Sequence, residues 1–237
     1  VTVAVDSDPP VDAAAANGLR EVLVDVNVGM PRSRCAPGDA GRVAGRAHER
    51  GLTVRGVMGY EGHVVGLEDR SERTAKTDAA MEQLLAAHAA VGGDVVSAGG
   101  TGTYDVNTVA TEIQAGSYAL MDTAYSKLGL PFRPALVIAA TVIHAGDHWA
   151  VADCGLKAHS MDHGNPTVED GTVWFCSDEH LTFASNTTVG VGDRVLVWPA
   201  HVDPTVALHE RLHVADGPGL AAQVVDRWPV DLRGWDC

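Results

Sequence analysis

Apolar residues in the first half of the chain follow two alternating spacings. Short valine-rich runs predict β-strands, and the stretches between them, with apolar residues every three or four positions, predict helices. The expected strands cover residues 1–5, 21–28, 52–58, 94–97 and 112–114, and the expected helices cover residues 9–18, 39–50 and 69–91. Alternation of strands and helices predicts parallel strands joined by right-handed crossovers.

The pattern changes at the proline-containing segment 131–134. Beyond it, valine- and threonine-rich runs alternate with turns, and only residues 204–213 have helical spacing. The expected strands there cover residues 136–143, 149–153, 171–175 and 194–198. We therefore expect two domains: residues 1–130, with about five βα units, and residues 131–237, a mainly antiparallel β domain. Five parallel strands form either an open sheet or part of an eight-stranded barrel, and periodicity alone does not distinguish them.

The charge and the cysteine content narrow the class of protein. A formal net charge of -14 argues against nucleic acid or an anionic membrane as partner, because both would repel the chain. No apolar run is long enough to span a bilayer, and the first residues lack a basic-then-apolar signal segment. Cys35, Cys154, Cys176 and Cys237 have no C-x-x-C spacing, so we interpret them as reduced thiols in a cytoplasmic protein.

A glycine-rich turn at residues 97–103, Ser-Ala-Gly-Gly-Thr-Gly-Thr, follows one expected strand. Glycines allow backbone N–H groups to approach a phosphate closely, and threonine hydroxyls add donors. The spacing fits neither a dinucleotide fingerprint nor a P-loop, and a tight turn that merely uses glycine is the alternative. A second turn at residues 114–118, Gln-Ala-Gly-Ser-Tyr, follows the next strand. Two such turns at the carboxyl ends of adjacent strands are typical of the phosphate site of a barrel.

Polar residues also follow two earlier strands. Arg32 closes the sequence Gly-Met-Pro-Arg after one strand, and Tyr60 and His63 belong to Tyr-Glu-Gly-His after the next. Because the carboxyl ends of parallel strands meet at one edge, we expect these side chains to converge on a common mouth. His63 is then a catalytic candidate, although an isolated histidine is more often a surface or capping residue.

Two motifs in the second half could bind a metal. His201 and Asp203 form an H-x-D pair, and two such side chains in an extended segment point the same way. A nitrogen and an oxygen donor suit Mn²⁺, Mg²⁺ or Zn²⁺. The rival is H-E-x-x-H at His209, Glu210 and His213, which on a helix would give two zinc ligands and the general base of a metallopeptidase. No His or Glu follows His213 as a third ligand, so a solvated helix face is the alternative.

Taken together, these segments resemble the D-threonine aldolase and eukaryotic-type D-serine dehydratase family, the metal-dependent branch of the alanine-racemase-like pyridoxal enzymes. The matching stretches, in the family's order, are VLVDVNVGMPRSR, GVMGYEGH, SAGGTGTYDV, TEIQAGSYALMD, DCGLKAHSMDHGNP, SDEHLTF and WPAHVDPTVALHERLHV. They extend over almost the whole chain. The resemblance implies an α/β plus β fold: a partial (β/α)8 barrel, with about the last five βα units, followed by a mainly antiparallel β domain.

The resemblance also implies which residues bind the cofactor, pyridoxal 5'-phosphate. Thr101, Gly116 and Ser117 would hold the phosphate, with Gly100 helping through its backbone. Arg32 and Tyr60 would contact the ring: Arg32 would face its phenolic oxygen, and Tyr60 would line it. Gln114 falls where alanine racemases place an arginine against the pyridine nitrogen.

His201 and Asp203 match the metal ligands of the family. The dehydratases are similar but usually carry a cysteine at the second position, which gives a zinc site. Asp203 therefore favours an aldolase and a harder ion, Mn²⁺, with Zn²⁺ or Mg²⁺ as alternatives.

The lysine that carries the cofactor in this family lies on the first barrel strand, before the region matched here. The three lysines of this chain are Lys76, Lys127 and Lys157, and none of them ends an expected barrel strand. We therefore expect either an N-terminally truncated chain or a gene model with a wrong start, beginning at about the fourth barrel strand.

The expected function is cleavage of D-3-hydroxy amino acids, for example D-threonine to glycine and acetaldehyde, with His63 as the base. The reaction would depend on pyridoxal phosphate and a divalent cation, and the family suggests a homodimer. The first alternative is dehydration of D-serine or D-threonine by an enzyme of the same family. The second is a degenerate protein that binds the cofactor without catalysis.

Overall fold

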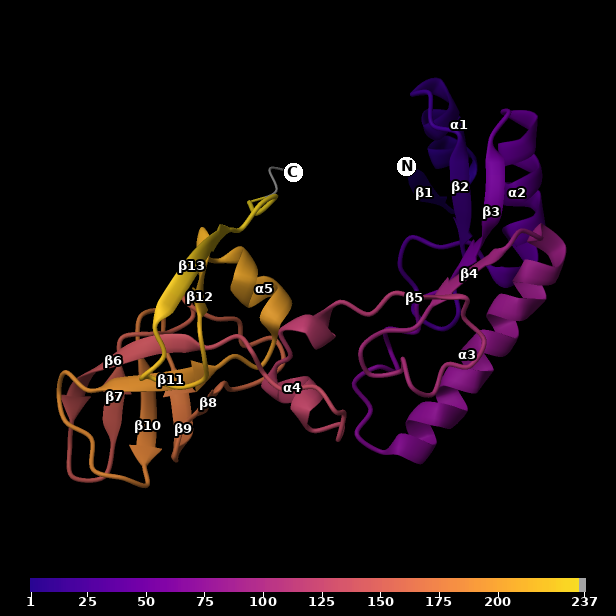
Figure 1. Ribbon diagram of the computed structural model, residues 1–237. Helices are drawn as coiled ribbons and strands as arrows, with labels where there is room; N and C mark the ends of the chain where they lie inside the picture. The colour runs from indigo at the N-terminus through magenta and orange to yellow at the C-terminus, as the bar shows by residue number, and fades with distance from the viewer. Residues whose placement is uncertain (235–237) are drawn as a thin grey trace. The chain divides into compact units, whose positions relative to one another are not determined.

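The computed structural model describes residues 1–234 and divides the chain into two units, Val1–Gly116 and Ser117–Cys237 (Figure 1). Each unit has its own β-sheet and its own buried core. The expected boundary at residue 130 falls inside the second unit, which already begins at Ser117. Within residues 1–234, no helix combines the length and the apolar character needed to cross a membrane.

The first unit is built on five parallel strands that lie side by side in chain order. They are β1 (Thr2–Val5), β2 (Glu21–Asp25), β3 (Thr53–Met58), β4 (Val95–Ala98) and β5 (Glu112–Ile113). Helices α1 (Asp8–Ala16), α2 (Ala40–Glu49) and α3 (Arg70–Val91) follow the first three strands, and the short 3-10 helix η1 (Pro37–Asp39) precedes α2. The predicted parallel pairing is confirmed. Since all five strands run in the same direction, their carboxyl ends share one edge of the sheet.

The core of the first unit joins the valine-rich strands to helix α3. In β2, the buried Val22 and Val24 alternate with partly exposed residues, and both belong to the same apolar cluster as Leu84 of α3. The helix has a signal at each end. Asp69 caps its N-terminus by accepting a backbone N–H from the first turn, and Gly92, with a φ of 75°, ends it in a conformation that favours glycine.

The second unit contains a six-stranded antiparallel sheet. Its strands are β6 (Ile138–Ala145), β7 (Ala150–Ala152), β8 (Thr167–Val168), β9 (Gly171–Cys176), β10 (Leu181–Ser185) and β11 (Arg194–Trp198), in the order β8-β11-β6-β7-β10-β9. β8 and β9, at the two ends of this order, also contact each other, so the sheet curls round a core that includes Phe183. The expected antiparallel β fold is confirmed, and β8 and β10 are additional strands that the apolar pattern did not predict.

The remaining elements of the second unit are short. They are η2 (Ser117–Ala119), α4 (Thr123–Ser126), α5 (Val202–Ala207) and the antiparallel hairpin of β12 (Arg211–Ala215) and β13 (Val224–Pro229). The helix expected over residues 204–213 is therefore wrong beyond Ala207. The spacing of apolar residues over so short a segment is compatible with both structures, and the pairing of β12 with β13 selects the strand.

This hairpin also overturns the zinc-peptidase interpretation of H-E-x-x-H. His209 lies in the connection that precedes β12, and His213 lies within β12, so the two histidines do not share a helical face. Nε2 of His209 lies 2.8 Å from the carbonyl oxygen of Ala158. The motif thus lacks the helix that its metal geometry requires, and the alternative of a solvated helix face is wrong for the same reason.

Three of the four cysteines lie in the described part of the chain, and each is a free thiol, as their spacing predicted. Burial raises the pKa of Cys35 to about 11, that of Cys154 to about 12 and that of Cys176 to about 11. These thiols therefore remain protonated and unreactive near neutral pH. Cys237 lies outside the described residues.

Candidate functional site

The carboxyl edge of the parallel sheet brings together several of the residues predicted from sequence. Tyr60 follows β3, and Gly100 and Thr101 follow β4, which is the neighbour of β3. The ring of Tyr60 lies against the glycine-rich turn: a Cβ built on Gly100 would be 2.8 Å from Cε2 of Tyr60. A Cβ on Gly102 would be 1.7 Å from the carbonyl oxygen of Val65. Glycine is therefore required at both positions so that the turn can pack closely on the loop after β3.

A buried carboxylate that the sequence reading missed holds this turn in place. Glu61 is fully buried, and its carboxylate accepts hydrogen bonds from the backbone N–H of Gly99 (3.0 Å), from the hydroxyl of Thr103 (2.7 Å) and from the side-chain amide of Asn107 (3.3 Å). The Thr103 hydroxyl in turn accepts the N–H of Gly100 at 3.0 Å. A relay of hydrogen bonds thus connects the loop after β3 to the turn after β4.

A second missed residue, Arg34, contacts Tyr60 from the loop after β2. Its guanidinium donates a hydrogen bond to the carbonyl oxygen of Tyr60 at 2.6 Å, and its Cζ lies 6.0 Å from the centre of the Tyr60 ring. Its side chain is fully buried, and among the described residues its Nη2 has no hydrogen-bond partner. Arg32, the arginine that the family resemblance selected, is exposed. Arg34 is therefore the arginine of this loop that presents a buried donor without a partner among the described residues.

Arg34 also forms an ion pair with Asp25 at the end of β2, with Nε 3.3 Å from Oδ1 but outside hydrogen-bonding geometry. Burial raises the pKa of the Asp25 carboxyl to about 6, against the opposing influence of the Arg34 and Arg32 charges. Removing the carboxylate from water therefore destabilises its charged form more than the two positive charges stabilise it.

His63, the predicted base, lies over a glycine of the loop after β2. A Cβ built on Gly29, whose φ is 125°, would be 2.6 Å from Nε2 of His63. The backbone N–H of Gly29 donates to the side chain of Asn27 at 3.0 Å, which fixes the turn under the imidazole. The exposed imidazole is therefore supported at the same edge of the sheet as Tyr60.

The turn after β5 is divided between the two units. Gln114 and Gly116 belong to the first unit. The side-chain amide of Gln114 donates to the hydroxyl of Ser97 at 3.0 Å. A Cβ built on Gly116 would meet no atom within 4 Å. Ser117 belongs to the second unit, and its hydroxyl donates to Oδ2 of Asp203 at 3.3 Å. Ser117, predicted to bind phosphate, thus contacts the predicted metal pair.

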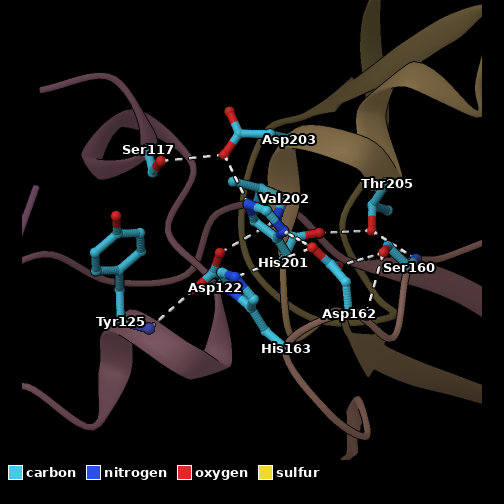
Figure 2. Close-up of polar contacts among 10 residues, drawn as sticks. All are labelled: Ser117, Asp122, Tyr125, Ser160, Asp162, His163, His201, Val202, Asp203 and Thr205. Atoms are coloured by element: carbon cyan, nitrogen blue, oxygen red, sulfur yellow. Dashed lines mark hydrogen bonds and ion pairs between the residues drawn. The ribbon is translucent and has the colours of Figure 1, made fainter. Parts of the chain in front are cut away.

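The predicted metal pair lies at the start of α5 (Figure 2). His201 is the extended residue before the helix, Asp203 lies in its first turn, and Nε2 of His201 is 3.2 Å from Oδ2 of Asp203. Asp162, which sequence reasoning missed, lies on the other side of the same ring, with Oδ2 2.6 Å from Nδ1 of His201. The ring of His163 stacks on that of His201 with centroids 3.9 Å apart. Ligand atoms of Asp162, His163 and His201 also lie within 4.8 Å of one another.

Asp122 attaches this motif to the first residues of the second unit. Its side chain is fully buried, accepting the backbone N–H of Tyr125 at 2.9 Å through Oδ1 and that of Val202 at 3.1 Å through Oδ2 (Figure 2). The backbone N–H of Thr123 donates to the carbonyl oxygen of Pro199. These contacts explain why residues 117–130 belong to the unit that contains His201.

Three known proteins are similar to most of this chain. A 3-hydroxy-D-aspartate aldolase from Paracoccus denitrificans (strain Pd 1222) is 31% identical over 265 residues, which cover 99% of this chain and 67% of that protein. A D-threonine aldolase from Arthrobacter sp is 33% identical over 243 residues, with coverages of 91% and 61%. The crystal structure of D-threonine aldolase from Filomicrobium marinum has 30% identity and a TM-score of 0.87, and the match covers 96% of this chain and 68% of that chain.

The same comparisons bear on the fold and on the second unit. The chain spans between 61% and 68% of the length of these three proteins. Residues 135–215 match the model of a putative serine dehydratase domain, a segment that contains Asp162, His201 and Asp203. Together with the parallel sheet of the first unit and the antiparallel sheets of the second, the structural match confirms a partial barrel followed by a β domain.

Replacement of Glu61 by glutamine should destabilise the first unit by roughly 1–3 kcal/mol, because an amide N–H₂ would face donors that now have an acceptor. Urea unfolding followed by circular dichroism measures this change, and hydrogen exchange of residues 97–107 should accelerate. Glu82→Gln, an exposed change on α3, is the matched control and should stay within about 0.5 kcal/mol of wild type. Equal effects of the two variants would contradict the role of Glu61.

Replacement of Arg34 by glutamine should raise the pKa of Asp25 above about 6, since the substitution removes the positive charge that lowers that pKa most and leaves the burial that raises it. A ¹³C NMR titration of the Asp25 carboxyl carbon measures the shift. Arg32→Gln removes a positive charge with a smaller influence on Asp25 and should raise the pKa of Asp25 by a smaller amount. A fall in the pKa of Asp25 in the Arg34 variant would contradict this account.

Proposed function

Because the chain belongs to the D-threonine aldolase and D-serine dehydratase family, we propose that the protein cleaves the Cα–Cβ bond of small D-3-hydroxy amino acids. D-Threonine would give glycine and acetaldehyde. The observation that carries the proposal is the His201–Asp203 pair, a nitrogen and an oxygen donor 3.2 Å apart in the segment that matches the family model. The relatives at 31% and 33% identity, both named as aldolases, support it.

The residues of the first unit fit the phosphate side of pyridoxal phosphate. Thr101 adds a hydroxyl to the turn that Gly100 and Gly102 allow to pack closely on the loop after β3, and the buried Nη2 of Arg34 is a donor for an anionic oxygen, whereas the N–H of Gly100 is already donated to Thr103. We propose that these residues hold the cofactor, with Gly116 from the next turn and with Tyr60 along its ring. When bound, this cofactor supplies an electron sink for the charge that develops at Cα.

The lysines of the chain do not follow strands of the parallel sheet. Lys76 lies on α3 and pairs with Glu72 at 2.7 Å, Lys157 pairs with Glu179, and Lys127 follows α4 in the second unit. None of the three is therefore proposed as the lysine that carries the cofactor.

The residues of the second unit fit a divalent cation. We propose that Nε2 of His201 and the carboxylate of Asp203 are its ligands. A carboxylate in place of a thiolate favours a harder ion, Mn²⁺ over Zn²⁺. When bound, such an ion lowers the pKa of a coordinated hydroxyl, which here is the hydroxyl on the β-carbon of the substrate.

His63 is the proposed base in this reaction. Its imidazole is exposed and is supported by Gly29, so it can accept a proton from a substrate that enters from solvent. The alternative function, dehydration, is favoured by one observation, the match of residues 135–215 to a serine dehydratase domain. In that reaction the β-hydroxyl leaves and ammonia is released, whereas the aldolase releases glycine.

Products decide between the two reactions. The protein expressed from its complete reading frame, with pyridoxal phosphate and Mn²⁺ added, should convert D-threonine to glycine and acetaldehyde, and 3-hydroxy-D-aspartate to glycine and glyoxylate. Amino acid analysis and an aldehyde assay measure these products. Release of ammonia with the corresponding 2-oxo acid would identify the protein as a dehydratase instead of an aldolase. The absence of both reactions, together with binding of pyridoxal phosphate, would indicate a protein that binds the cofactor without catalysis.

Substitution of His63 by alanine should lower kcat roughly 10²–10⁴-fold, which is the usual contribution of a positioned general base. His48→Ala, an exposed histidine on α2, is the matched control and should leave kcat at its wild-type value. Steady-state glycine formation from D-threonine measures both. A His63→Ala enzyme with wild-type kcat would remove His63 from the chemistry.

A further inference from the structure

The imidazole of His201 lies between two carboxylates. Its Nδ1 is 2.6 Å from Oδ2 of Asp162, and its Nε2 is 3.2 Å from Oδ2 of Asp203 (Figure 2). An ionised carboxylate only accepts hydrogen bonds, and a neutral imidazole carries one N–H. In the neutral ring, therefore, only one of these two contacts has a proton, and the other nitrogen presents a lone pair.

The surroundings of Asp162 determine which contact has the proton. The Ser160 hydroxyl donates to Oδ1 of Asp162, and the N–H of Ser160 donates to the hydroxyl of Thr205 at 3.1 Å. Thr205 is buried, and its hydroxyl donates to the carbonyl oxygen of His201 at 2.7 Å. These contacts form a closed ring of hydrogen bonds that returns to His201, so Asp162 is fixed relative to the histidine that it contacts.

Among the described residues, Asp203 has no comparable support. Its side chain is 66% exposed, against 50% for that of Asp162, and within residues 1–234 its contacts are the 3.3 Å hydrogen bond from Ser117 and the 3.2 Å approach of His201. Oδ2 of Asp162 lies 2.6 Å from Nδ1 of His201, whereas Oδ2 of Asp203 lies 3.2 Å from Nε2, and the Ser160 hydroxyl also holds the Asp162 carboxylate. Asp162 is thus the better acceptor for the single imidazole N–H.

The geometry points to Asp162 as a positioning residue: it accepts the Nδ1–H of His201, which leaves the Nε2 lone pair directed toward Asp203 and available to a divalent cation. A carboxylate that orients a metal-binding histidine through its other nitrogen fixes the tautomer and increases the basicity of the ligand. The assignment of the tautomer stands on the contacts of Asp162. Its consequence for the cation rests on the proposed function.

A different arrangement, in which Asp162, His163 and His201 jointly bind one ion, conflicts with the ring geometry. The two imidazoles are stacked with an interplanar angle of 6° and centroids 3.9 Å apart. An imidazole binds a metal through a lone pair in its own plane, at about 2.0–2.1 Å. Two parallel planes so far apart cannot both contain one ion, so His163 and His201 are not ligands of the same metal in this conformation.

The test reads the tautomer directly. Long-range ¹H–¹⁵N NMR of the histidine-labelled, metal-free protein at pH 8, with the His201 signals identified by their loss in His201→Gln, should show a protonated Nδ1 and an unprotonated Nε2. Asp162→Asn should shift His201 toward the form protonated at Nε2, because the new amide can donate to Nδ1. Asp147→Asn, in an exposed turn of the same unit, is the matched control and should keep the wild-type signals.

The consequence for the cation is measured as Mn²⁺ affinity, by electron paramagnetic resonance of free Mn²⁺. Asp162→Asn should weaken binding roughly 10–100-fold, the usual effect of removing a residue that orients a ligand. Ser160→Ala, which keeps the carboxylate and removes one of its supports, should give a smaller loss and provides a second variant if Asp162→Asn does not fold. Asp147→Asn should bind Mn²⁺ as wild type does.

The outcomes separate this inference from the proposed function. A wild-type His201 protonated at Nε2, or a tautomer unchanged in Asp162→Asn, would overturn the role of Asp162 whatever the enzyme does. A changed tautomer with unchanged Mn²⁺ affinity would overturn its consequence for the cation. A wild-type protein that shows the Nδ1–H form and binds no Mn²⁺ would contradict the metal site of the proposed function and leave the tautomer assignment supported.

Discussion

The carboxylate of Glu61 is the contact on which the arrangement of the first unit's site depends. A buried carboxylate must find hydrogen-bond donors, and the donors here are on Gly99, on Thr103 and on a nearby asparagine, all after β4. Because Glu61 itself follows β3, the two loops cannot shift independently without leaving it unsatisfied. Its neighbour Tyr60 is held against Gly100 as a result, so the ring of Tyr60 has a fixed position beside the glycine-rich turn.

The second unit uses the same device. Asp122 is as deeply buried as Glu61, and its two oxygens accept backbone N–H groups from Tyr125 and from Val202. One carboxylate thereby caps α4 and fixes the first turn of α5, where Asp203 lies. In each unit, a carboxylate with no exposed surface connects segments that are far apart in sequence, and the residues with proposed chemistry are neighbours of that carboxylate.

Sequence alone predicted the parts of this molecule that local pattern determines. The alternating valines of β2, the helical spacing of α3 and the glycine-rich turn after β4 each express a local requirement of the backbone or of one buried face. Arg211–Ala215 was misread because its partner strand lies beyond the local window. Glu61, Arg34 and Asp162 were missed because each is defined by contacts with distant residues: Asp162 meets His201 39 positions later in the chain.

The two carboxylates beside His201 differ in a way that suits two tasks. A metal ligand must exchange the contacts it makes without the ion for a bond to the ion. Asp203 loses only two long contacts, of 3.2 and 3.3 Å, and its side chain is largely exposed. A residue that orients a ligand must already be in place before the ion binds. Asp162 meets this requirement, because it lies 2.6 Å from Nδ1 of His201 and accepts a hydrogen bond from Ser160. The imidazole between them therefore has one fixed side and one free side. This asymmetry orients the histidine in advance, so that less conformational freedom is lost when an ion binds.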